Sequence, residues 1–569
     1  MPAHALLSQL SSLLGKKNIA TRANAKQHFT RGWRSGGGDA LAVLFPQTLV
    51  QLWQALEACV EANCIIIMQA ANTGLTEGST PSGNQYDRAV VVINTLAIND
   101  IIVLDQSEQV LSFAGATLHQ LESVLQPMGR SPHSVIGSSC LGASIVGGVA
   151  NNSGGALVKR GPAYTELALF ARVNEHGKLE LVNHLGIELG NEPIEILTRL
   201  QQGKFNKAPA PTHAKASASD YETIVRDVNA ATPSRFNADP TRLFEASGCA
   251  GKLAVFAVRL DTFATAKREQ TFYVGCNSPH TLSKLRRVML STFTHLPDVA
   301  EYMHRDTFNI AHQYGKDTFL SVQKLGTARL PALFSLKGKI DATLSKLPWA
   351  PTGLTDRLMQ SASALMPEHL PQRLLDFENR YEHHLILKTT DAGIEEARQC
   401  LSDFFQSEPL NNVDGNYFAC TDDEARSAYL HRFAAAGAAI RYQLIHRKRV
   451  GDILALDIAL RRNDADWVEV LPDNINWHIE KRLYYGHFFC HVFHQDYILK
   501  QGSDAAAVKK AMLAHLDSRG AKYPAEHNVG HLYEAEQTLQ QFYHSLDPTN
   551  TFNPGIGGMS KHRRNCACC

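Results

Sequence analysis

The sequence predicts an α+β protein of two or three domains, and three observations lead to this prediction. The 569 residues exceed what one hydrophobic core normally supports. Residues 49–60 carry apolar side chains at helical spacing and lead into the short β-branched run 65–68, which predicts a helix followed by a buried strand. Runs of both kinds continue along the chain, and such mixing is typical of α+β domains.

The same two periodicities predict the remaining elements. We expect helices at residues 118–125 and 282–290, and strands at 90–93, 101–104, 166–172, 179–182, 272–274, 383–388 and 454–461. Residues 201–220 are polar and rich in Ala, Pro and Ser, which predicts an exposed, mobile insertion. Residues 431–441 have mostly small side chains and predict either a helix or a close-packed turn.

The charge balance excludes a general affinity for nucleic acid, because 56 basic and 55 acidic residues nearly cancel. The 11 cysteines without regular spacing indicate a reducing compartment rather than a disulfide framework. The start of the chain lacks the features of a signal peptide, and no apolar run approaches the roughly 18 residues of a membrane span. If the protein meets a membrane, we expect it to lie on the surface.

Residues 324–373 differ from the rest in charge. They carry seven Lys or Arg against three acidic residues, interleaved with leucines, Phe334, Trp349 and five prolines. Two interpretations remain open. The segment is either a solvated helical surface over a small core, or an amphipathic anchor that binds an anionic lipid surface.

Two glycine-rich stretches predict a phosphate-containing ligand. The first follows the strand at 65–68 and places Gly74 and Gly78 among Asn, Thr and Ser, so that several backbone N–H groups can reach one anion. The second, residues 133–155, contains six glycines and no charged side chain after His133. The chain has neither the Gly-x-Gly-x-x-Gly of a Rossmann site after a strand nor the Gly-Lys-Ser/Thr motif of a P-loop.

Together the two stretches resemble the flavin-contacting segments of the vanillyl-alcohol oxidase family. The resemblance implies a bound FAD, and the absence of His and Cys from residues 69–79 predicts that it is held without a covalent link. In the first loop the FAD pyrophosphate would contact Ala70, Ala71, Asn72, Thr73, Gly74, Gly78 and Ser79. The second loop would line the isoalloxazine and ribityl chain with Gly137, Ser144 and Gly154, and Val255 would close the site after the turn at Gly251.

Histidines near the C-terminus predict a catalytic site. Residues 486–494 hold three histidines and residues 524–531 hold two more. One such histidine is usually a hydrogen-bonded core residue, but five beside a carboxylate favour chemistry, because each buried imidazole needs partners. We expect His527 to be a general base, with Glu526 orienting the imidazole and raising its basicity.

Residues 525–530 and 547–557 resemble two signatures of the FAD-linked 2-hydroxyacid dehydrogenases, and the similarity to their bacterial respiratory branch extends over about residues 5–560. The resemblance implies oxidation of D-lactate to pyruvate, with hydride passing from C2 to the flavin and electrons then reaching a membrane quinone. Arg432 would bind the lactate carboxylate, although the tryptophan that accompanies this arginine in the relatives is missing. Another D-2-hydroxyacid is an alternative substrate, and an inactive assembly subunit is the alternative from another class.

The same resemblance raises the question of a metal. In related 2-hydroxyglutarate dehydrogenases, two histidines and the glutamate before the catalytic histidine hold a divalent ion. This chain keeps His487, His494 and Glu526 at similar spacing but lacks the Gly-Asp-Gly between the histidines. Two imidazoles and a carboxylate suit Zn²⁺ or another divalent ion. A hydrogen-bonded substrate pocket without metal is the alternative, and both remain open.

These expectations divide the chain into five segments. Residues 1–265 form the FAD domain, 266–323 and 381–520 form two parts of a cap over the substrate, and 324–380 form a basic, mostly helical membrane-associated insertion. Residues 521–569 return to the FAD domain and end in an unordered, cysteine-containing tail. The resemblance also implies a peripheral protein on the cytoplasmic face of the bacterial inner membrane. The sequence leaves the oligomeric state open.

Overall fold

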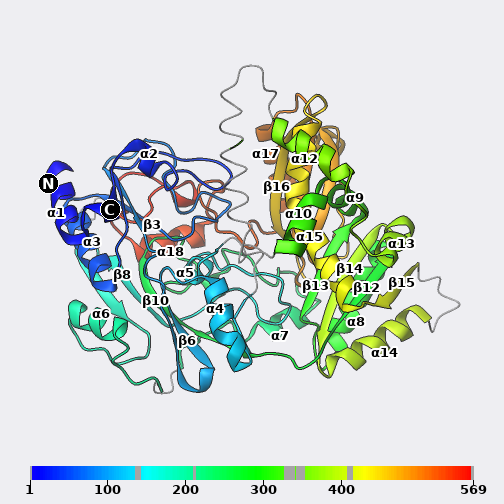
Figure 1. Cartoon of the computed structure of the whole chain (residues 1–569), viewed down its shortest axis with the longest axis horizontal. Helices are drawn as coiled ribbons and strands as arrows, with labels where there is room; N and C mark the ends of the chain where they lie inside the picture. The colour runs from blue at the N-terminus through cyan, green and yellow to red at the C-terminus, as the bar shows by residue number, and fades with distance from the viewer. Residues whose placement is uncertain are drawn as a thin grey trace.

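The computed structural model describes residues 3–134, 142–208, 213–325, 340, 353–406 and 414–564. Figure 1 shows two lobes. The N-terminal lobe holds most of the chain up to β11 (Phe263–Ala264) together with the C-terminal segment, and the second lobe holds the chain between them. Helices and sheets are mixed in both lobes, which confirms the predicted α+β class.

The first sheet of the N-terminal lobe has the strand order β1-β2-β4-β3. The strands β2 (Ala42–Leu44) and β3 (Ile65–Gln69) both pair in parallel with β4 (Val90–Asn94), and β1 (Ile19–Ala20) is antiparallel to β2. The strands are rich in β-branched residues because both faces are covered. Helices α1 (Ala3–Leu14) and α3 (Leu49–Glu61) pack on one face, and the short α2 (Ala23–Lys26) lies between β1 and β2 in the chain.

The second sheet of this lobe is antiparallel, in the order β5-β6-β10-β8-β9. Its strands are β5 (Ile101–Val103), β6 (Gln109–Phe113), β8 (Ala168–Val173), β9 (Leu179–Asn183) and β10 (Ala254–Asp261). Helices α4 (Leu118–Leu125) and α5 (Ile145–Ala150) pack on it through Leu121, Ile145 and Val149. The lobe is completed by β7 (Arg130–Ser131), which pairs with β11, and by α6 (Pro193–Gln201), α7 (Tyr221–Arg226) and α18 (Gln537–Leu546).

The second lobe is built on a seven-stranded antiparallel sheet with the order β15-β12-β14-β13-β17-β18-β16. The strands are β12 (Glu269–Cys276), β13 (Val299–His304), β14 (His383–Thr390), β15 (Gly415–Ala419), β16 (Val450–Ala459), β17 (Ile479–His487) and β18 (Val492–Lys500). Strands from both predicted parts of the cap therefore share one sheet. The exact segment boundaries stay a prediction.

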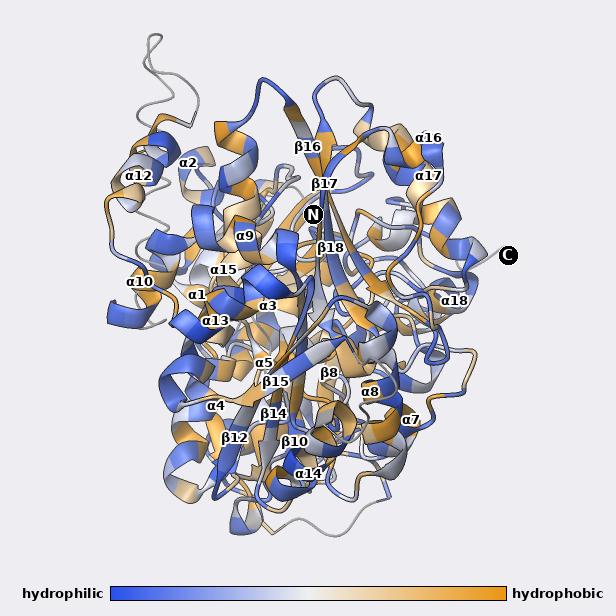
Figure 2. Cartoon of the chain, turned by 90° about the vertical axis from the view of Figure 1, so that its right-hand side faces the viewer, coloured by the Kyte–Doolittle hydropathy of each residue, from blue (hydrophilic) through white to orange (hydrophobic). Residues whose placement is uncertain are grey.

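Helices cover both faces of this sheet, because alternate side chains of each strand point to opposite sides. Phe272 and Leu385 face α8 (Pro279–Thr292), α14 (Gly393–Gln406), α16 (Asp473–Asn476) and α17 (Ala505–Ser518). Tyr273 and Ile386 face α9 (Arg305–Tyr314), α10 (Lys316–Leu325), α13 (Gln372–Arg380) and α15 (Asp422–Ile445). Figure 2 shows blue and orange residues alternating along these helices, as expected when one side packs on a sheet and the other meets water.

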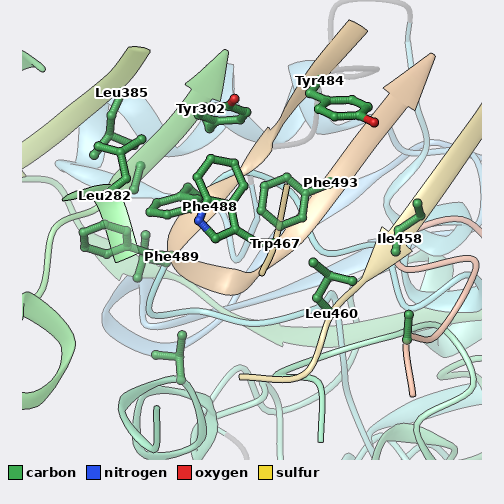
Figure 3. Packing of buried hydrophobic residues seen from close by; sticks show 14 of the residues in the cluster. Leu282, Tyr302, Leu385, Ile458, Leu460, Trp467, Tyr484, Phe488, Phe489 and Phe493 are labelled. Carbon is green, nitrogen blue, oxygen red and sulfur yellow. The ribbon is translucent and has the colours of Figure 1, made fainter. Parts of the chain in front are cut away.

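An aromatic cluster fixes the first of these faces (Figure 3). The Trp467 ring stacks on Phe493 at 5.5 Å between centroids and meets the edge of Tyr302 at 4.7 Å. Its indole N–H donates to Ser283 Oγ at 2.9 Å, so the buried polar atom has a partner. The cluster holds β13 and β18 together, on either side of β17. Both strands also carry functional side chains.

Each predicted helix and strand is present within a few residues of its expected bounds, and residues 431–441 lie inside the helix α15. One expectation was wrong in part. The end of the insertion 201–220 is not exposed, since Ala216, Ser217 and Ala218 are buried. Glu166 N–H donates to Lys215 O at 2.7 Å and Lys215 N–H donates to the Glu166 carboxylate at 2.9 Å, which bonds this stretch to the chain just before β8.

The basic segment falls largely outside the described residues, which include its positions 324–325, 340 and 353–373. The described part contains α12 (Leu354–Ala364) and the start of α13. Leu358, Leu365 and Met366 are exposed there. Among the helices that the structure describes, none is long and apolar enough to cross a membrane.

The C-terminal segment returns to the first sheet and pairs with it. Ile66 N–H donates to Thr551 O, and Asn553 N–H donates to Ile66 O. The buried Asp547 carboxylate accepts from the N–H groups of Thr551 at 3.1 Å and Phe552 at 2.7 Å. Because these N–H groups are buried away from water, they depend on the Asp547 carboxylate as their hydrogen-bond acceptor.

We therefore expect Asp547→Ala to destabilise the protein by about 2–3 kcal/mol, since two buried donors lose their acceptor. The matched control is Asp504→Ala, which removes a carboxylate that also accepts from two N–H groups, at the exposed start of α17. That change should cost only about 1 kcal/mol. Urea unfolding followed by tryptophan fluorescence measures both, and equal losses would contradict the role of burial.

Candidate active site

The loop after β3 leaves its backbone donors free. Within the described part of the chain, no backbone N–H group from residue 70 to residue 79 donates a hydrogen bond. The loop is held from behind, because Gln69 Nε2 donates to Ser79 O at 2.8 Å and Asn94 Nδ2 donates to Ala70 O at 2.9 Å. Asn72 and Glu77 adopt positive φ, which turns neighbouring N–H groups toward a common side. Such an array fits the pyrophosphate of a dinucleotide.

The glycines of this region differ in the space around them. A Cβ added at Gly74 would meet no protein atom within 4 Å, so that position faces open space of the kind a ligand fills. A Cβ at Gly78 would lie 2.7 Å from Asn528 Nδ2, and one at Gly530 would lie 1.8 Å from Thr76 O. Gly78 and Gly530 therefore allow the C-terminal segment to approach the loop, whereas Gly74 leaves room beside it.

Asn528 joins three segments that lie far apart in the sequence. Its Oδ1 accepts from Thr76 Oγ1 at 2.7 Å, and its Nδ2 donates to Asn151 Oδ1 at 2.6 Å. Asn553 adds a further link by donating to Gly78 O at 2.7 Å. The two glycine-rich stretches and the C-terminal segment thus meet at one place, as a shared FAD site requires.

The remaining predicted flavin contacts have definite positions. Thr73 lies in the free-donor loop, and Ser144 is the N-cap of α5, where its Oγ accepts from Gly147 N–H at 3.1 Å. Val255 lies in β10 and packs with Ile145 and Val149 of α5. Gly137 lies outside the described residues. Contacts of these residues with FAD stay a prediction.

Glu526 is the centre of a buried charge network. One carboxylate oxygen accepts from Arg235 and from Gly155 N–H at 3.2 Å, and the other lies 3.2 Å from His487 Nε2. Gly154 allows this approach, because a Cβ there would lie 2.6 Å from Glu526 Oε1. Although burial alone would raise the pKa of Glu526, the nearby His487 and Arg235 hold it well below its ordinary value.

His487 lies between two carboxylates. Its Nδ1 is 2.5 Å from Glu301 Oε1, and its Nε2 faces Glu526. Burial lowers the pKa of this imidazole, but Glu301 and Glu526 outweigh burial and raise the pKa to about 10. In the absence of a metal His487 is therefore an imidazolium held by two anions.

His494 faces the same Glu526 oxygen as His487, at 3.9 Å, and His527 lies beside His494. The ring of His494 is 3.1 Å from Asp457 Oδ1, and Asp457 Oδ2 accepts from the backbone N–H groups of Glu526 and His527. The rings of His494 and His527 are 6.4 Å apart between centroids. The His527 ring makes no hydrogen bond to any described residue, so its nitrogens remain available to a substrate.

The structure qualifies the expectation for Glu526. Its carboxylate makes no hydrogen bond to the His527 ring among the described residues, and its oxygens bond to Arg235, Gly155 and His487. Burial lowers the pKa of His527, but the charges of Asp457 and Glu526 act to raise it, and Asp457 also accepts from the His527 backbone N–H. The predicted orienting role of Glu526 stays a prediction.

Arg432 projects from α15 toward the same network. Its guanidinium is 3.1 Å from Glu301 Oε2 and lies over the Tyr485 ring at 4.4 Å. Its Nε has no hydrogen-bond partner among the described residues. The structure brings the predicted site residues Arg432, His487, His494, Glu526 and His527 into one network, while their roles stay a prediction.

Three residues of the site were missed by sequence reasoning. Glu301 and Asp457 lie in the ordinary strands β13 and β16, and nothing in their local sequence distinguishes them. Arg235 is only 2% exposed, and its Nε and Nη1 have no partner in the described part of the chain. A buried arginine with free donors indicates an anionic or carbonyl-bearing ligand.

Three atoms of the network are arranged as metal ligands. His487 Nε2 lies 3.3 Å from His494 Nε2 and 3.2 Å from Glu526 Oε2, and the third side of the triangle is 3.9 Å. Ligands of one tetrahedral zinc ion stand about 3.3 Å apart, given metal–nitrogen distances of about 2.0–2.1 Å. The residues therefore fit a divalent ion without rearrangement.

We expect Gly74→Ala to weaken FAD binding by about 10- to 100-fold, because one methyl group forced against a ligand costs about 1–3 kcal/mol. The apoprotein should keep its thermal stability, since the added Cβ meets no protein atom. FAD titration followed by flavin fluorescence measures the effect, and acid precipitation should release all flavin from the wild type.

The control for this change is Gly437→Ala on the exposed side of α15, where a Cβ also meets nothing within 4 Å. It should leave FAD affinity unchanged and raise stability by about 1 kcal/mol. Normal FAD affinity in the Gly74 variant would place the cofactor elsewhere.

Known proteins are similar in sequence to this chain. A family model described as "D-lactate dehydrogenase, membrane binding" matches residues 271–565, and one described as "FAD binding domain" matches residues 40–179. The quinone-dependent D-lactate dehydrogenase of Escherichia coli (strain K12) is 56% identical over 98% of this chain and 97% of its own length. The corresponding protein of Haemophilus influenzae is 54% identical over 99% of both chains.

A solved structure shows the fold. p-Cresol methylhydroxylase with substrate bound superposes with a TM-score of 0.57 over 98% of this chain and 97% of that chain, at 11% identity. This likeness and the FAD-domain match confirm the flavin domain of the vanillyl-alcohol oxidase type. With more than half of its residues identical to two full-length relatives, the chain belongs to the family of quinone-dependent D-lactate dehydrogenases.

Proposed function

We propose that this protein oxidises D-lactate to pyruvate and passes the electrons to a membrane quinone. The observation that carries the proposal is the His527 ring, which makes no hydrogen bond to any described residue and lies beside the buried network of Glu526, His487 and Arg432. The free donors of residues 70–79 supply the adjoining FAD site. Family membership supports the choice of substrate and acceptor. A different D-2-hydroxyacid would use the same residues.

His527 is the proposed general base. Burial lowers the pKa of its imidazole, and Asp457 offsets only part of this effect, so the ring is neutral near pH 7 and able to accept a proton. Bound FAD supplies the acceptor for the hydride that leaves C2 of the substrate. His527 removes the hydroxyl proton, and Asp457 keeps the backbone that carries it in place.

Arg432 is the proposed partner of the substrate carboxylate. Glu301 and the Tyr485 ring fix the guanidinium, so little conformational freedom is lost when a substrate binds. The unpartnered Nε points to a ligand that accepts hydrogen bonds. Arg235, with two free donors beside Glu526, is a second candidate for contact with the substrate or cofactor.

We also propose that His487, His494 and Glu526 bind a divalent ion. Such an ion would polarise the hydroxyl and carboxylate oxygens of a 2-hydroxyacid and so favour loss of the proton. His487 must release its own proton to act as a ligand, so binding should weaken in acid. The alternative is the same network without metal, in which His487 is a hydrogen-bond donor to both carboxylates.

His527→Ala should retain FAD but lose turnover by roughly 10²–10⁴-fold, the usual effect of removing a general base. The direct measurement is anaerobic mixing with D-lactate, which should bleach the flavin of the wild type rapidly and that of the variant slowly. Arg432→Lys should mainly raise KM, because a lysine cannot provide the planar, two-point contact.

His515→Ala is a suitable control, since His515 lies in α17, outside the network. Bleaching of its flavin should match the wild type. If His527→Ala also bleaches at a normal rate, the base is another residue, with His487 and His494 next to be tested. If D-lactate bleaches the wild-type flavin slowly and another D-2-hydroxyacid bleaches it rapidly, that other acid is the substrate and the proposed mechanism is unchanged.

The protein associates with a membrane peripherally, as its match to a membrane-binding family model indicates. We propose the cytoplasmic face of the bacterial inner membrane, with anionic lipid as the contact surface. Residues 324–373 have an excess of four positive charges, seven minus three, and Leu358 and Leu365 on the described part are 61% and 90% exposed. Phe334 and Trp349, which we expect to enter the interface, lie outside the described residues.

Replacing Lys337, Lys339 and Lys346 together by Glu should release the enzyme from anionic vesicles, because each charge near such a surface is worth about 1 kcal/mol. Binding of the wild type should also weaken as salt shortens the Debye length to below about 8 Å. Quinone reduction should slow, while electron transfer to a soluble dye continues. Cosedimentation with vesicles measures binding.

The control reverses three exposed lysines of the N-terminal lobe, Lys16, Lys17 and Lys207, and so changes the net charge equally. This control should still bind. If both triple variants leave the vesicles, net charge alone governs binding. If neither triple variant leaves the vesicles, the basic segment is an ordinary solvated surface.

A further inference from the structure

A second cluster of histidines and a carboxylate lies outside the active site. It forms where α9 meets the chain between α12 and α13, and its members are His312 of α9 with Glu368 and His369. His431 of α15 packs beside them, with its ring centroid 6.3 Å from that of His369 and 6.5 Å from that of His312. The proposed function uses none of these four side chains.

The ligand atoms of the cluster are close together. His312 Nε2 lies 3.0 Å from each oxygen of Glu368, and His369 Nδ1 lies 3.3 Å from Glu368 Oε1. The rings of His312 and His369 are stacked at 5.2 Å. Ligand atoms around one tetrahedral zinc ion stand about 3.3 Å apart, so these spacings suit a single ion.

Two buried imidazoles at this place have nitrogens without a hydrogen-bond partner among the described residues. The His369 side chain is 0% exposed, yet neither of its nitrogens has a hydrogen-bond partner among the described residues. His431 bonds to Phe308 O through Nε2, but its Nδ1 is also unpartnered and buried. Leaving such groups unsatisfied costs about 1–3 kcal/mol each, which a bound ion would remove.

The surroundings allow an ion to enter and be held. Glu368 is 45% exposed and gives access from solvent. Two backbone N–H groups, of His369 and Leu370, already fix its Oε1, so the carboxylate is oriented toward the imidazoles. Lys316, whose charge acts on His369, donates to Met366 O and so has a partner of its own. Phe319 covers His369 at 4.7 Å between ring centroids and limits access of water.

We propose that His312, Glu368 and His369 bind a divalent transition-metal ion of the zinc class. Two imidazoles and one carboxylate are preferred ligands of Zn²⁺, and His431 Nδ1 or water completes the set. Because Glu368 and His369 lie near the end of the basic segment 324–373, the ion fixes that end to α9. The site differs from the one formed by His487, His494 and Glu526, with which it shares no ligand.

The test compares zinc binding by the full-length holoenzyme and its variants after removal of metals with a chelator. Zinc ions alone are the probe, and plasma mass spectrometry with a competing chromophoric chelator gives stoichiometry and affinity. Glu368→Gln and His369→Ala should each lose one bound zinc ion per chain relative to the wild type, or bind it about 100-fold more weakly or worse. This difference holds whether or not the active site also binds zinc.

Folding is controlled in two ways. Glu368→Gln keeps the shape and the acceptor for the two backbone N–H groups, so it tests the site without disturbing the core. His280→Ala removes an exposed histidine at the start of α8 and should keep the full zinc content. Zinc should also raise the melting temperature of the wild type more than that of Glu368→Gln. Equal zinc content in wild type, Glu368→Gln and His369→Ala overturns the proposal. His312 and Glu368 are then a hydrogen-bonded pair that binds no metal.

Discussion

The arrangement of both lobes depends on the buried carboxylate of Glu526. A buried charge without partners is strongly unfavourable, and removing one partner of a buried pair costs about 3–5 kcal/mol. Glu526 therefore needs Arg235, His487 and the N–H of Gly155, which come from the chain between α7 and β10, from β17 and from the second glycine-rich stretch. Satisfying one carboxylate brings the lobes together at the place where substrate and flavin must meet.

The return of the C-terminal segment follows from the same constraint. The segment that carries Glu526 also supplies Asn528 to the first loop and Asn553 to Gly78. Gly530 permits contact with Thr76 that no side chain would allow. The free N–H groups of residues 70–79 are thus held in position before any ligand arrives, so little ordering remains to oppose FAD binding.

Periodicity predicted the elements of the fold, but it could not predict the whole site. Residues 65–68, 118–125 and 383–388 have patterns that local sequence determines, and each became the expected strand or helix. Site residues were found where their type was unusual, as for His487, His494 and His527. Glu301 and Asp457 escaped because their importance comes from register across a seven-stranded sheet, where β13 sets Glu301 opposite His487 and β16 sets Asp457 opposite His494. Sequence adjacency indicated only part of the relation between Glu526 and His527, since the charge of Glu526 acts against burial to raise the pKa of His527 but its carboxylate hydrogen-bonds to Arg235, Gly155 and His487.

The helix α15 connects the active site with the end of the basic segment 324–373. Its consecutive residues Arg432 and His431 point to different neighbours, because successive side chains on a helix differ by about 100° in direction. Arg432 meets Glu301 of β13, whereas His431 meets Phe308 of α9 and the ring of His369. A capping box of Thr421 and Glu424 fixes the start of this 24-residue helix, and Arg373, the last residue of the basic segment, bonds the same Glu424. One rigid element therefore holds the proposed substrate arginine and the end of the basic segment at constant separation. Where this segment meets lipid as proposed, the helix holds the substrate site at a constant distance from the membrane.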